Sequence, residues 1–298
     1  MAEVVTLRSV LADSPLSAPL KQGAIASPRI RLDFAEVSPV HKAFAPMVRR
    51  QAYDLCELAI VTALQAIAYG RPVVLLPAVV ASRFQRGCLI ALRPRAFAPE
   101  DLAGKRIGVR AYTQTTGMWV RAHLAEDYGL AAPRMRWFTR DGAHVEQYRD
   151  PCFVERAPDG KSLPDMLRDG DIDAAILGND LPEGDEFVPV VPDAAVRDRT
   201  WWERHGFMPI NHMVVAGGDI VRRDPAAVAE AYRLLVQAGR ASRRPEGSPQ
   251  PTAFGFGALR DPVRFVIDAC MEQGLLSRRL DVDEVFAPAR KILGTLAD

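Results

Sequence analysis

The chain has 298 residues, with 38 basic and 37 acidic side chains and a formal net charge of +1. This near balance, with charges spread along the sequence, argues against a nucleic-acid-binding surface, and the length fits one large or two modest α/β domains. No stretch is apolar for long enough to span a bilayer, and the first residues lack the features of a secretory signal, so we expect a cytoplasmic protein.

The first third of the chain alternates strand and helix patterns, with polar residues after the strands. Asp13 and Ser14 follow the first strand in a turn, and Glu57 lies near the start of a helix, where it either complements the helix dipole or takes part in chemistry. Arg83 and Arg86 lie in a loop after a buried strand and are either solvated or available to pair with a carboxylate. Strands are expected at 4–11, 29–34, 72–77 and 88–92, and helices at 38–50 and 59–69.

The segment 101–130 is the clearest strand, turn and helix unit. A β-branched apolar run at 106–112 indicates a buried strand, and helical spacing follows until Gly129. The turn between them holds Tyr112, Thr113, Gln114, Thr115 and Thr116. Their hydroxyl groups either cap the helix or, together with the free N–H groups at its start, bind a carboxylate or phosphate.

The rest of the chain continues the alternation, which is typical of a parallel sheet wrapped by helices. Asn179 follows one strand, and His212 precedes another; a histidine there is commonly structural, yet it is also the natural proton carrier near neutral pH. Asp224-Pro225 and Asp261-Pro262 both look like helix starts. Strands are expected at 174–177, 186–191 and 213–215, helices at 162–167, 224–243, 261–274 and 282–296, and a loop at 244–257.

The four cysteines stand alone in the sequence, without a C-x-x-C pair or a histidine at metal-ligand spacing; they are Cys56, Cys88, Cys152 and Cys270. This pattern argues against a disulfide framework and against a structural zinc site, so we predict no metal site. Free cysteine is among the most buried residue types, and we therefore assign these four to packing.

An ordered set of motifs resembles the 4,5-dihydroxyphthalate decarboxylase family, with agreement in order and spacing over about residues 30–240. The motifs are Y-D-L-C-E-L-A at 53–59, S-R-F-Q-R-G at 82–87, D-L-A-G-K-R-I-G-V at 101–109, T-x-x-x-W-x-R from Thr115 to Arg121, E-D-Y-G at 126–129, M-L-R-D-G-D-I-D-A at 166–174, G-F-M-P-I-N-H at 206–212 and E-Q-G-L at 272–275. Each motif alone is weak, whereas the ordered set is specific.

The resemblance implies an α/β fold like that of the type II periplasmic binding proteins, with two lobes joined by crossing strands and a ligand cleft between them. On that basis we expect residues 1–92 and 213–298 to form the first lobe and residues 93–212 to form the second. The polar turns that follow the strands would then converge on the cleft from distant parts of the sequence.

The resemblance also implies a non-oxidative decarboxylase that acts on a hydroxylated aromatic carboxylate, similar to 4,5-dihydroxyphthalate, in aromatic catabolism. Such a reaction needs no organic cofactor if a ring hydroxyl supplies the electrons. His212 is then the first choice for the proton donor and Glu57 the second. The residues expected to bind substrate are Asp13, Ser14, Arg83, Arg86, Tyr112, Thr113, Gln114, Thr115, Thr116 and Asn179.

An alternative is a solute-binding-type protein that binds an aromatic or other small carboxylate without chemistry. Two departures from the family pattern favour a changed substrate or this alternative. Segment 11–15 lacks the family's aromatic and arginine residues, and Arg86 stands where the family has a histidine. Either way we expect a small-molecule carboxylate as partner and neither nucleic acid nor membrane, while a homo-oligomer stays open.

Overall fold

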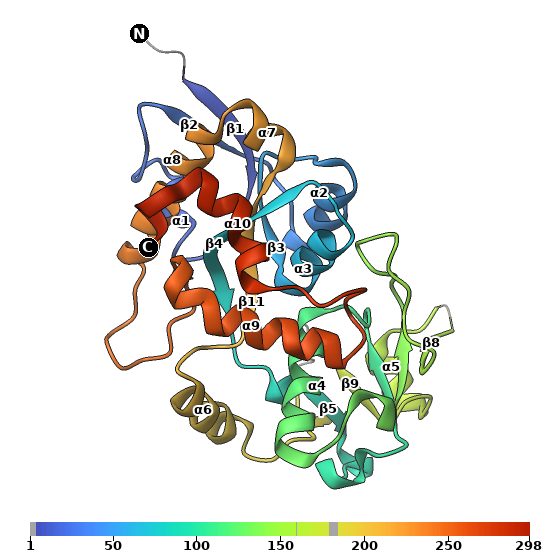
Figure 1. Ribbon diagram of the computed structural model, residues 1–298. Helices are drawn as coiled ribbons and strands as arrows, with labels where there is room; N and C mark the ends of the chain where they lie inside the picture. The colour runs from blue at the N-terminus through green and yellow to red at the C-terminus, as the bar shows by residue number, and fades with distance from the viewer. Residues whose placement is uncertain (1–3, 159, 179–183) are drawn as a thin grey trace.

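The computed structural model describes residues 4–158, 160–178 and 184–298. The described strands form two six-stranded sheets, one in each of two lobes, and the first lobe is the upper one in Figure 1. The first sheet has the order β12-β4-β11-β3-β1-β2, made of β1 (Val5–Val10), β2 (Ile30–Phe34), β3 (Leu55–Ala59), β4 (Val73–Ser82), β11 (Ile210–Gly217) and β12 (Ala253–Phe254).

The second sheet is built from shorter strands in the order β10-β5-β9-β6-β7-β8. They are β5 (Leu89–Leu92), β6 (Arg106–Val109), β7 (Arg136–Thr139), β8 (Val154–Arg156), β9 (Ala174–Ile176) and β10 (Phe187–Pro189). The strand expected at 106–112 therefore ends three residues early, and 110–114 form the turn that leads into the next helix.

Both sheets are mixed, which corrects the expectation of purely parallel sheets. In the first sheet β1 pairs parallel with β2 and β3, while β11 runs antiparallel between β3 and β4. In the second sheet β6 pairs parallel with β7 and β9, while β5 pairs antiparallel with β9 and β10. The chain enters the second lobe through β5 and returns to the first through β11, and each of these strands runs antiparallel to its neighbours.

Helices cover both sheets (Figure 1). They are α1 (Ala18–Lys21), α2 (Phe44–Arg50), α3 (Ile60–Ala68), α4 (Thr115–Tyr128), α5 (Leu163–Asp169), α6 (Ala194–His205), α7 (Gly218–Arg223), α8 (Pro225–Ala241), α9 (Phe256–Glu272) and α10 (Val282–Leu293). The predicted start of α8 is confirmed, because Asp224 caps it by accepting the N–H of Ala227 at 2.9 Å. Within the described residues, none of these helices has the length and apolar character that a bilayer span requires.

The short helices α1 and α7 were not predicted from the sequence, and two longer helices also differ from the expectation. Helix α6 was not predicted, because its only buried side chains are Asp198 and Trp201 and so it lacks a clear apolar stripe. Helix α9 begins at Phe256 rather than at Pro262, which lies inside the helix. A proline in that place costs about 3 kcal/mol, but burying apolar side chains such as Phe256 and Val263 returns about 1.5–3 kcal/mol each.

The chain passes from the first sheet to the second between Ser82 and Leu89 and returns between Pro189 and Ile210. The lobe division expected from the sequence, 1–92 with 213–298 and 93–212, differs from sheet membership at two strands. Strand β5 belongs to the second sheet, and β11 begins at Ile210 in the first sheet. A backbone hydrogen bond joins the two crossing segments, because the Arg83 N–H donates to the Pro209 carbonyl at 3.2 Å.

Helix α9, from the last part of the chain, packs against α3 of the first lobe and α4 of the second. Phe265 stacks on Trp119 with ring centroids 5.3 Å apart, and the buried Arg121 donates to Gln273 at 2.6 Å. One continuous apolar core accordingly includes side chains of both lobes. The cleft between the lobes is therefore supported from behind by a packed, largely apolar contact.

Candidate functional site

A cavity of about 190 Å³ lies between the lobes and is lined from both of them. Its lining contains six of the twelve predicted site residues. The first lobe contributes Pro39, Val40, His41, Phe44, Ala59, Thr62, Arg83, Asn211 and His212, and the second contributes Arg110, Thr113, Gln114, Thr115, Thr116, His144 and Gly178. In the described part of the chain, three larger hollows, of about 220, 350 and 370 Å³, are lined by none of the predicted site residues.

The starts of α3 and α4 both face this cavity, because each helix follows a strand that ends at the cleft. Neither first turn is capped by the side chain of its N-cap residue, which is Ala59 in α3 and Gln114 in α4. The Thr115 hydroxyl instead accepts the N–H of Val61 from the facing helix at 3.4 Å. The threonines thus do not serve as N-caps of α4, and two positive helix ends meet at one cavity.

Arg83 comes from the first crossing segment and lies against the start of α4. Its Nη2 donates to the Thr116 hydroxyl at 2.7 Å. Gly178 leaves room for this arrangement, since a methyl group there would lie 3.2 Å from Arg83 Nη2 and 3.3 Å from Gln114 Nε2. The sequence therefore singled out an arginine that does line the cavity, beside the two threonines expected with it.

His212 and Glu57 form a hydrogen-bonded pair at the floor of the cavity. Strand β11 lies beside β3, and this pairing brings His212 Nδ1 to 2.6 Å from Glu57 Oε1. Glu57 is only 4% exposed and does not line the cavity; its other oxygen accepts the N–H of Ala12 at 2.7 Å. A carboxylate bound to Nδ1 orients the imidazole and leaves Nε2 as the nitrogen available to a ligand.

Asn211 is adjacent to that available nitrogen. Its Nδ2 donates to His212 Nε2 at 3.3 Å, so Nε2 accepts here and the ring proton lies on Nδ1, directed at Glu57. Asn211 was not among the residues expected to bind substrate. In the structure this amide lies in the cavity lining, within reach of the same ligand atoms as the imidazole.

His144 is a second imidazole in the cavity, and the sequence did not identify it as a site residue. It lies in the long loop between β7 and β8, with Nδ1 2.9 Å from the Thr62 hydroxyl of α3. Burial, with the positive charges of Arg110, His41 and Arg49, lowers the pKa of His144 to about 4. The ring is therefore neutral at pH 7.

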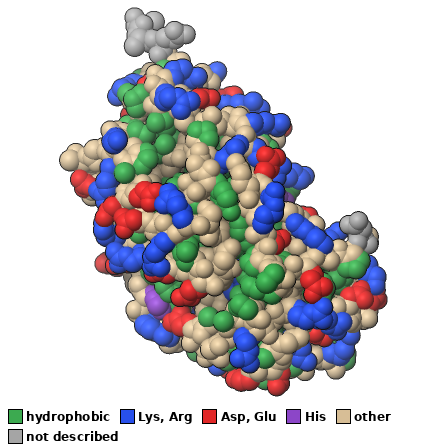
Figure 2. All heavy atoms as spheres, turned by 45° about the vertical axis from the view of Figure 1, so that its right-hand side comes forward, with side chains coloured by type: hydrophobic (Ala, Val, Ile, Leu, Met, Phe, Trp, Pro, Cys, Tyr) green, Lys and Arg blue, Asp and Glu red, His purple; other side chains and the backbone are tan. Residues whose placement is uncertain are grey.

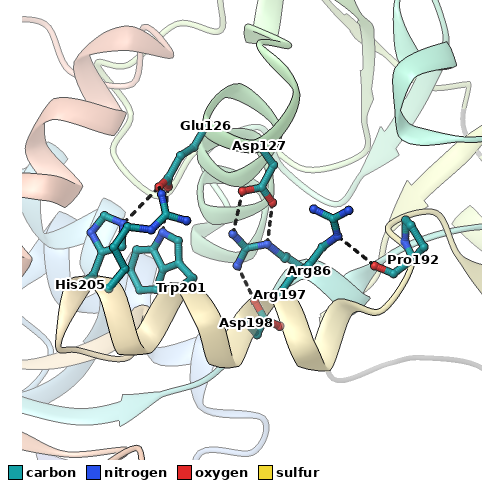
Figure 3. Close-up of polar contacts among 9 residues, drawn as sticks. Arg86, Glu126, Asp127, Pro192, Arg197, Asp198, Trp201 and His205 are labelled. Atoms are coloured by element: carbon teal, nitrogen blue, oxygen red, sulfur yellow. Dashed lines mark hydrogen bonds and ion pairs between the residues drawn. The ribbon is translucent and has the colours of Figure 1, made fainter.

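Arg86 lies outside the cavity, so the structure does not bring it to the other predicted site residues. Its guanidinium is buried between helices, donating to Asp127 of α4 at 2.8 Å and to Asp198 of α6 at 2.7 Å (Figure 3). Burial raises the pKa of Asp198, against the opposing effect of Arg86. With two carboxylates as partners, this arginine joins the first crossing segment to α4 and α6.

Three further predicted residues also lie away from the cavity lining. Asp13 is exposed and bonds Lys21 at 2.6 Å, and Ser14 belongs to a local turn with Ser17. Tyr112 is buried, donates its hydroxyl to the Gln273 carbonyl at 3.0 Å and packs under the Arg121 guanidinium. Asn179 lies outside the described residues.

The described lining carries two arginines and three histidines, and it contains no aspartate or glutamate. On the outer surface, by contrast, basic and acidic side chains are interspersed over the face in Figure 2. The concentration of one sign inside the cavity therefore favours an anionic ligand. Among the residues that the structure describes, no three or more His, Cys, Asp or Glu side chains are grouped to hold a metal ion.

Of the cavity residues that sequence reasoning missed, Arg110 follows a buried strand directly and could have been found by that position. His41 lies inside the helix expected at 38–50, and His144 lies in a segment without a periodic pattern, so only the folded chain reveals that both face the cavity.

The architecture is the two-lobed α/β fold of the periplasmic binding proteins, which confirms the expected fold class. Similar solved structures include the alkanesulfonate-binding protein SsuA from Xanthomonas axonopodis pv. citri, with a TM-score of 0.58 and 15% identity over 96% of this chain and 99% of that chain. For the aliphatic sulphonate binding protein SsuA from Escherichia coli, the TM-score is 0.60 and the identity 12%, over 95% of this chain and 92% of that chain. For the desulfurization enzyme DSZB, the TM-score is 0.52 and the identity 16%, over 98% of each chain.

Curated proteins identify the particular resemblance. The chain is 27% identical over 287 residues to a protein of Comamonas testosteroni named 4,5-dihydroxyphthalate decarboxylase, covering 81% of this chain and 84% of the relative. It is 32% identical over 139 residues to a Pseudomonas putida protein of the same name, covering 43% of this chain and 53% of the relative. No protein-family model matches the chain. These similarities confirm the resemblance that the ordered motifs indicated.

Proposed function

We propose that this protein is a non-oxidative decarboxylase of a hydroxylated aromatic carboxylate of the 4,5-dihydroxyphthalate type, acting in aromatic catabolism. The observation that carries the proposal is that His212, paired with the buried Glu57, lines a cavity whose described lining has no carboxylate. A proton donor beside an anion-binding wall is what loss of CO2 from an aromatic acid requires. The names of the two curated relatives support the same chemistry.

The anion-binding wall consists of Arg83, Thr116 and the start of α4. Arg83 and Thr116 are already bonded to each other, so a carboxylate that enters can share the guanidinium without a large movement of either side chain. The unsatisfied N–H groups of the first turn of α4 add a positive dipole end. We assign this wall to a carboxylate that stays on the ring, because its role is to hold and orient the substrate.

The reaction proceeds in two steps on a substrate whose hydroxyl is ionised. After a proton from solvent has bound His212 Nε2 and the Asn211 amide has moved off that nitrogen, His212 delivers the Nε2 proton to the ring carbon that bears the leaving carboxylate, and the phenolate oxygen becomes a ring carbonyl. The bond to the carboxylate then breaks, its electron pair returns through the ring to that oxygen, and CO2 leaves. One proton from solvent, passed through His212, is consumed for each CO2 released, and no organic cofactor is required.

Glu57 acts through His212 in this scheme. It is buried behind the imidazole and does not reach the cavity, so its place is that of a positioning residue rather than of the proton donor. Its second oxygen is held by the Ala12 N–H, which fixes the carboxylate and, through it, the imidazole.

The test is CO2 release by the purified protein with 4,5-dihydroxyphthalate, other hydroxylated aromatic acids and phthalate, which lacks a hydroxyl. We expect release from hydroxylated acids only. His212→Asn keeps a polar group near Nδ1 for Glu57 and should lower kcat by about 10²–10⁴-fold. His205→Asn, on α6 outside the cavity, is the matched control and should retain full activity.

Full activity of His212→Asn would remove His212 from the mechanism. Thermal stabilisation by these acids without any release of CO2 would instead support the solute-binding alternative, because a ligand that binds only the folded state raises apparent stability. A cytoplasmic location stays a prediction, which cell fractionation with activity assays would check.

A further inference from the structure

A second group of cavity residues lies apart from the proton donor and the carboxylate wall. It consists of His144 with Thr62 behind it and Arg110 nearby, and all three line the cavity. The scheme above does not use them, although it leaves one reacting atom without a partner. That atom is the ring oxygen, which regains negative charge as CO2 departs.

The orientation of His144 is set by its neighbours on the first lobe. Thr62 meets Nδ1 at 2.9 Å, and Phe44 presents its ring to the imidazole with centroids 5.6 Å apart and planes at 89°. The backbone carbonyl of His144 accepts Arg49 Nε at 2.8 Å, and that of Ala143 accepts Arg49 Nη2 at 3.1 Å. The loop of the second lobe is thus bound to the first lobe at the side chain and at the backbone.

The Thr62 contact occupies Nδ1 of His144 and leaves Nε2 for the ligand. When the Thr62 hydroxyl donates to Nδ1, the neutral imidazole carries its proton on Nε2 and can donate it into the cavity. The low pKa of His144, caused by burial and by Arg110, His41 and Arg49 against the opposing Asp141, keeps the ring neutral. A neutral imidazole is a hydrogen-bond donor to a developing oxyanion, and it does not protonate that oxyanion fully.

Two imidazoles contact the same aromatic ring, that of Phe44. Phe44 is 5.3 Å from His212 and 5.6 Å from His144, centroid to centroid, and it meets each at nearly a right angle. Both imidazoles line the one cavity, so a ligand of a single aromatic ring can meet both of them. Arg110 is held in place near the second imidazole by Asp141, to which its Nη1 donates at 2.9 Å.

We propose that His144, oriented by Thr62 and assisted by the charge of Arg110, is the oxyanion-stabilising residue for the substrate's ring hydroxyl. This inference rests on the proposed function and defines its substrate class. The acid must carry a hydroxyl ortho or para to the leaving carboxylate, because only those positions receive the electron pair of the breaking bond. In the second step the ring carbonyl becomes a phenolate, and the Nε2–H donates to it without transfer of the proton.

The test uses two substitutions of His144 whose side chains differ in length. His144→Asn keeps a polar group at about the position of Nδ1 for Thr62 and removes the donor at Nε2, whereas His144→Gln places an amide N–H near Nε2. Loss of one oxyanion donor lowers kcat by about 10²–10³-fold, so His144→Asn should fall by that factor with KM little changed. His144→Gln should recover part of the loss.

The carbon isotope effect at the departing carboxylate separates this role from a structural one. If the donor assists C–C cleavage, its loss makes that step more rate-limiting, and the ¹³C effect increases in His144→Asn. Binding of phthalate, which has no hydroxyl, should stay within about twofold of the unsubstituted protein and so report an intact cavity. Unchanged kcat and an unchanged isotope effect would overturn the proposal.

A binding measurement keeps the inference separate from the proposed function. Absorbance titration of bound 3,4-dihydroxybenzoate, the acid left when 4,5-dihydroxyphthalate loses one CO2, reports ionisation of its hydroxyls. One hydrogen bond to the charged oxygen lowers the pKa of the ligand hydroxyl by about one unit. In the His144→Asn complex that pKa should therefore be higher by about one unit. If the unsubstituted protein releases no CO2, the proposed function fails; equal titrations in both proteins overturn the role of His144.

Discussion

The neutral state of His144 predicts how the stability of the protein depends on pH. The imidazole has its ordinary pKa of 6.5 in the unfolded chain and a pKa of about 4 in the folded one, chiefly because of burial. The folded pKa is the lower one, so its contribution is fully present above pH 6.5. That contribution is lost progressively as the pH falls towards 4, where the loss ends.

The size of this effect follows from the shift. At 1.36 kcal/mol for each pKa unit, the contribution of His144 amounts to about 3 kcal/mol between pH 7 and pH 4. The side chain keeps some exposure to solvent, so this is an upper value. For a domain of ordinary stability it is still a large fraction of the free energy of unfolding.

The assay is urea denaturation of the unsubstituted protein and His144→Asn at pH 7, 6, 5 and 4. We expect the free energy of unfolding to fall more steeply with decreasing pH in the unsubstituted protein. Burial also lowers the pKa of His123, but this group is common to both proteins and cancels in the difference. A difference between the two proteins that stays constant from pH 7 to pH 4 would refute the reasoning.

Three other outcomes are expected. Arg86→Ala leaves two buried carboxylates without their partner and should destabilise the protein by about 3–5 kcal/mol in urea denaturation, whereas Arg199→Ala, at an exposed i,i+4 pair, should cost under about 1 kcal/mol. Gly178→Ala places a methyl group against the carboxylate wall, so KM should rise with little change in melting temperature. Glu230→Gln should flatten the stability loss between about pH 4.5 and 2, because hydrogen bonds from Arg233 lower the pKa of Glu230 to about 2 and its stabilising charge is lost as pH falls.

The local order of elements and part of the site follow from the sequence alone. The buried strand β4, the turn before α4 and the Asp224 cap are encoded in short stretches, because strand burial and capping depend on neighbouring residues. Arg83 after one expected strand and His212 before another were singled out by these positions, and both line one cavity, since strand ends of each sheet meet at the cleft. The ordered motifs supplied the fold class.

Only the tertiary structure decided which of these groups face the ligand. Arg83 and Arg86 look alike in the sequence, but the arrival of α6 beside α4 gives Arg86 two carboxylates and removes it from the cavity. Glu57 lies behind His212 because β11 pairs with β3 across about 150 residues of chain, a register that no local pattern encodes. His144 enters the site because its loop docks on the opposite lobe, and such long-range contacts exist only once both lobes are folded.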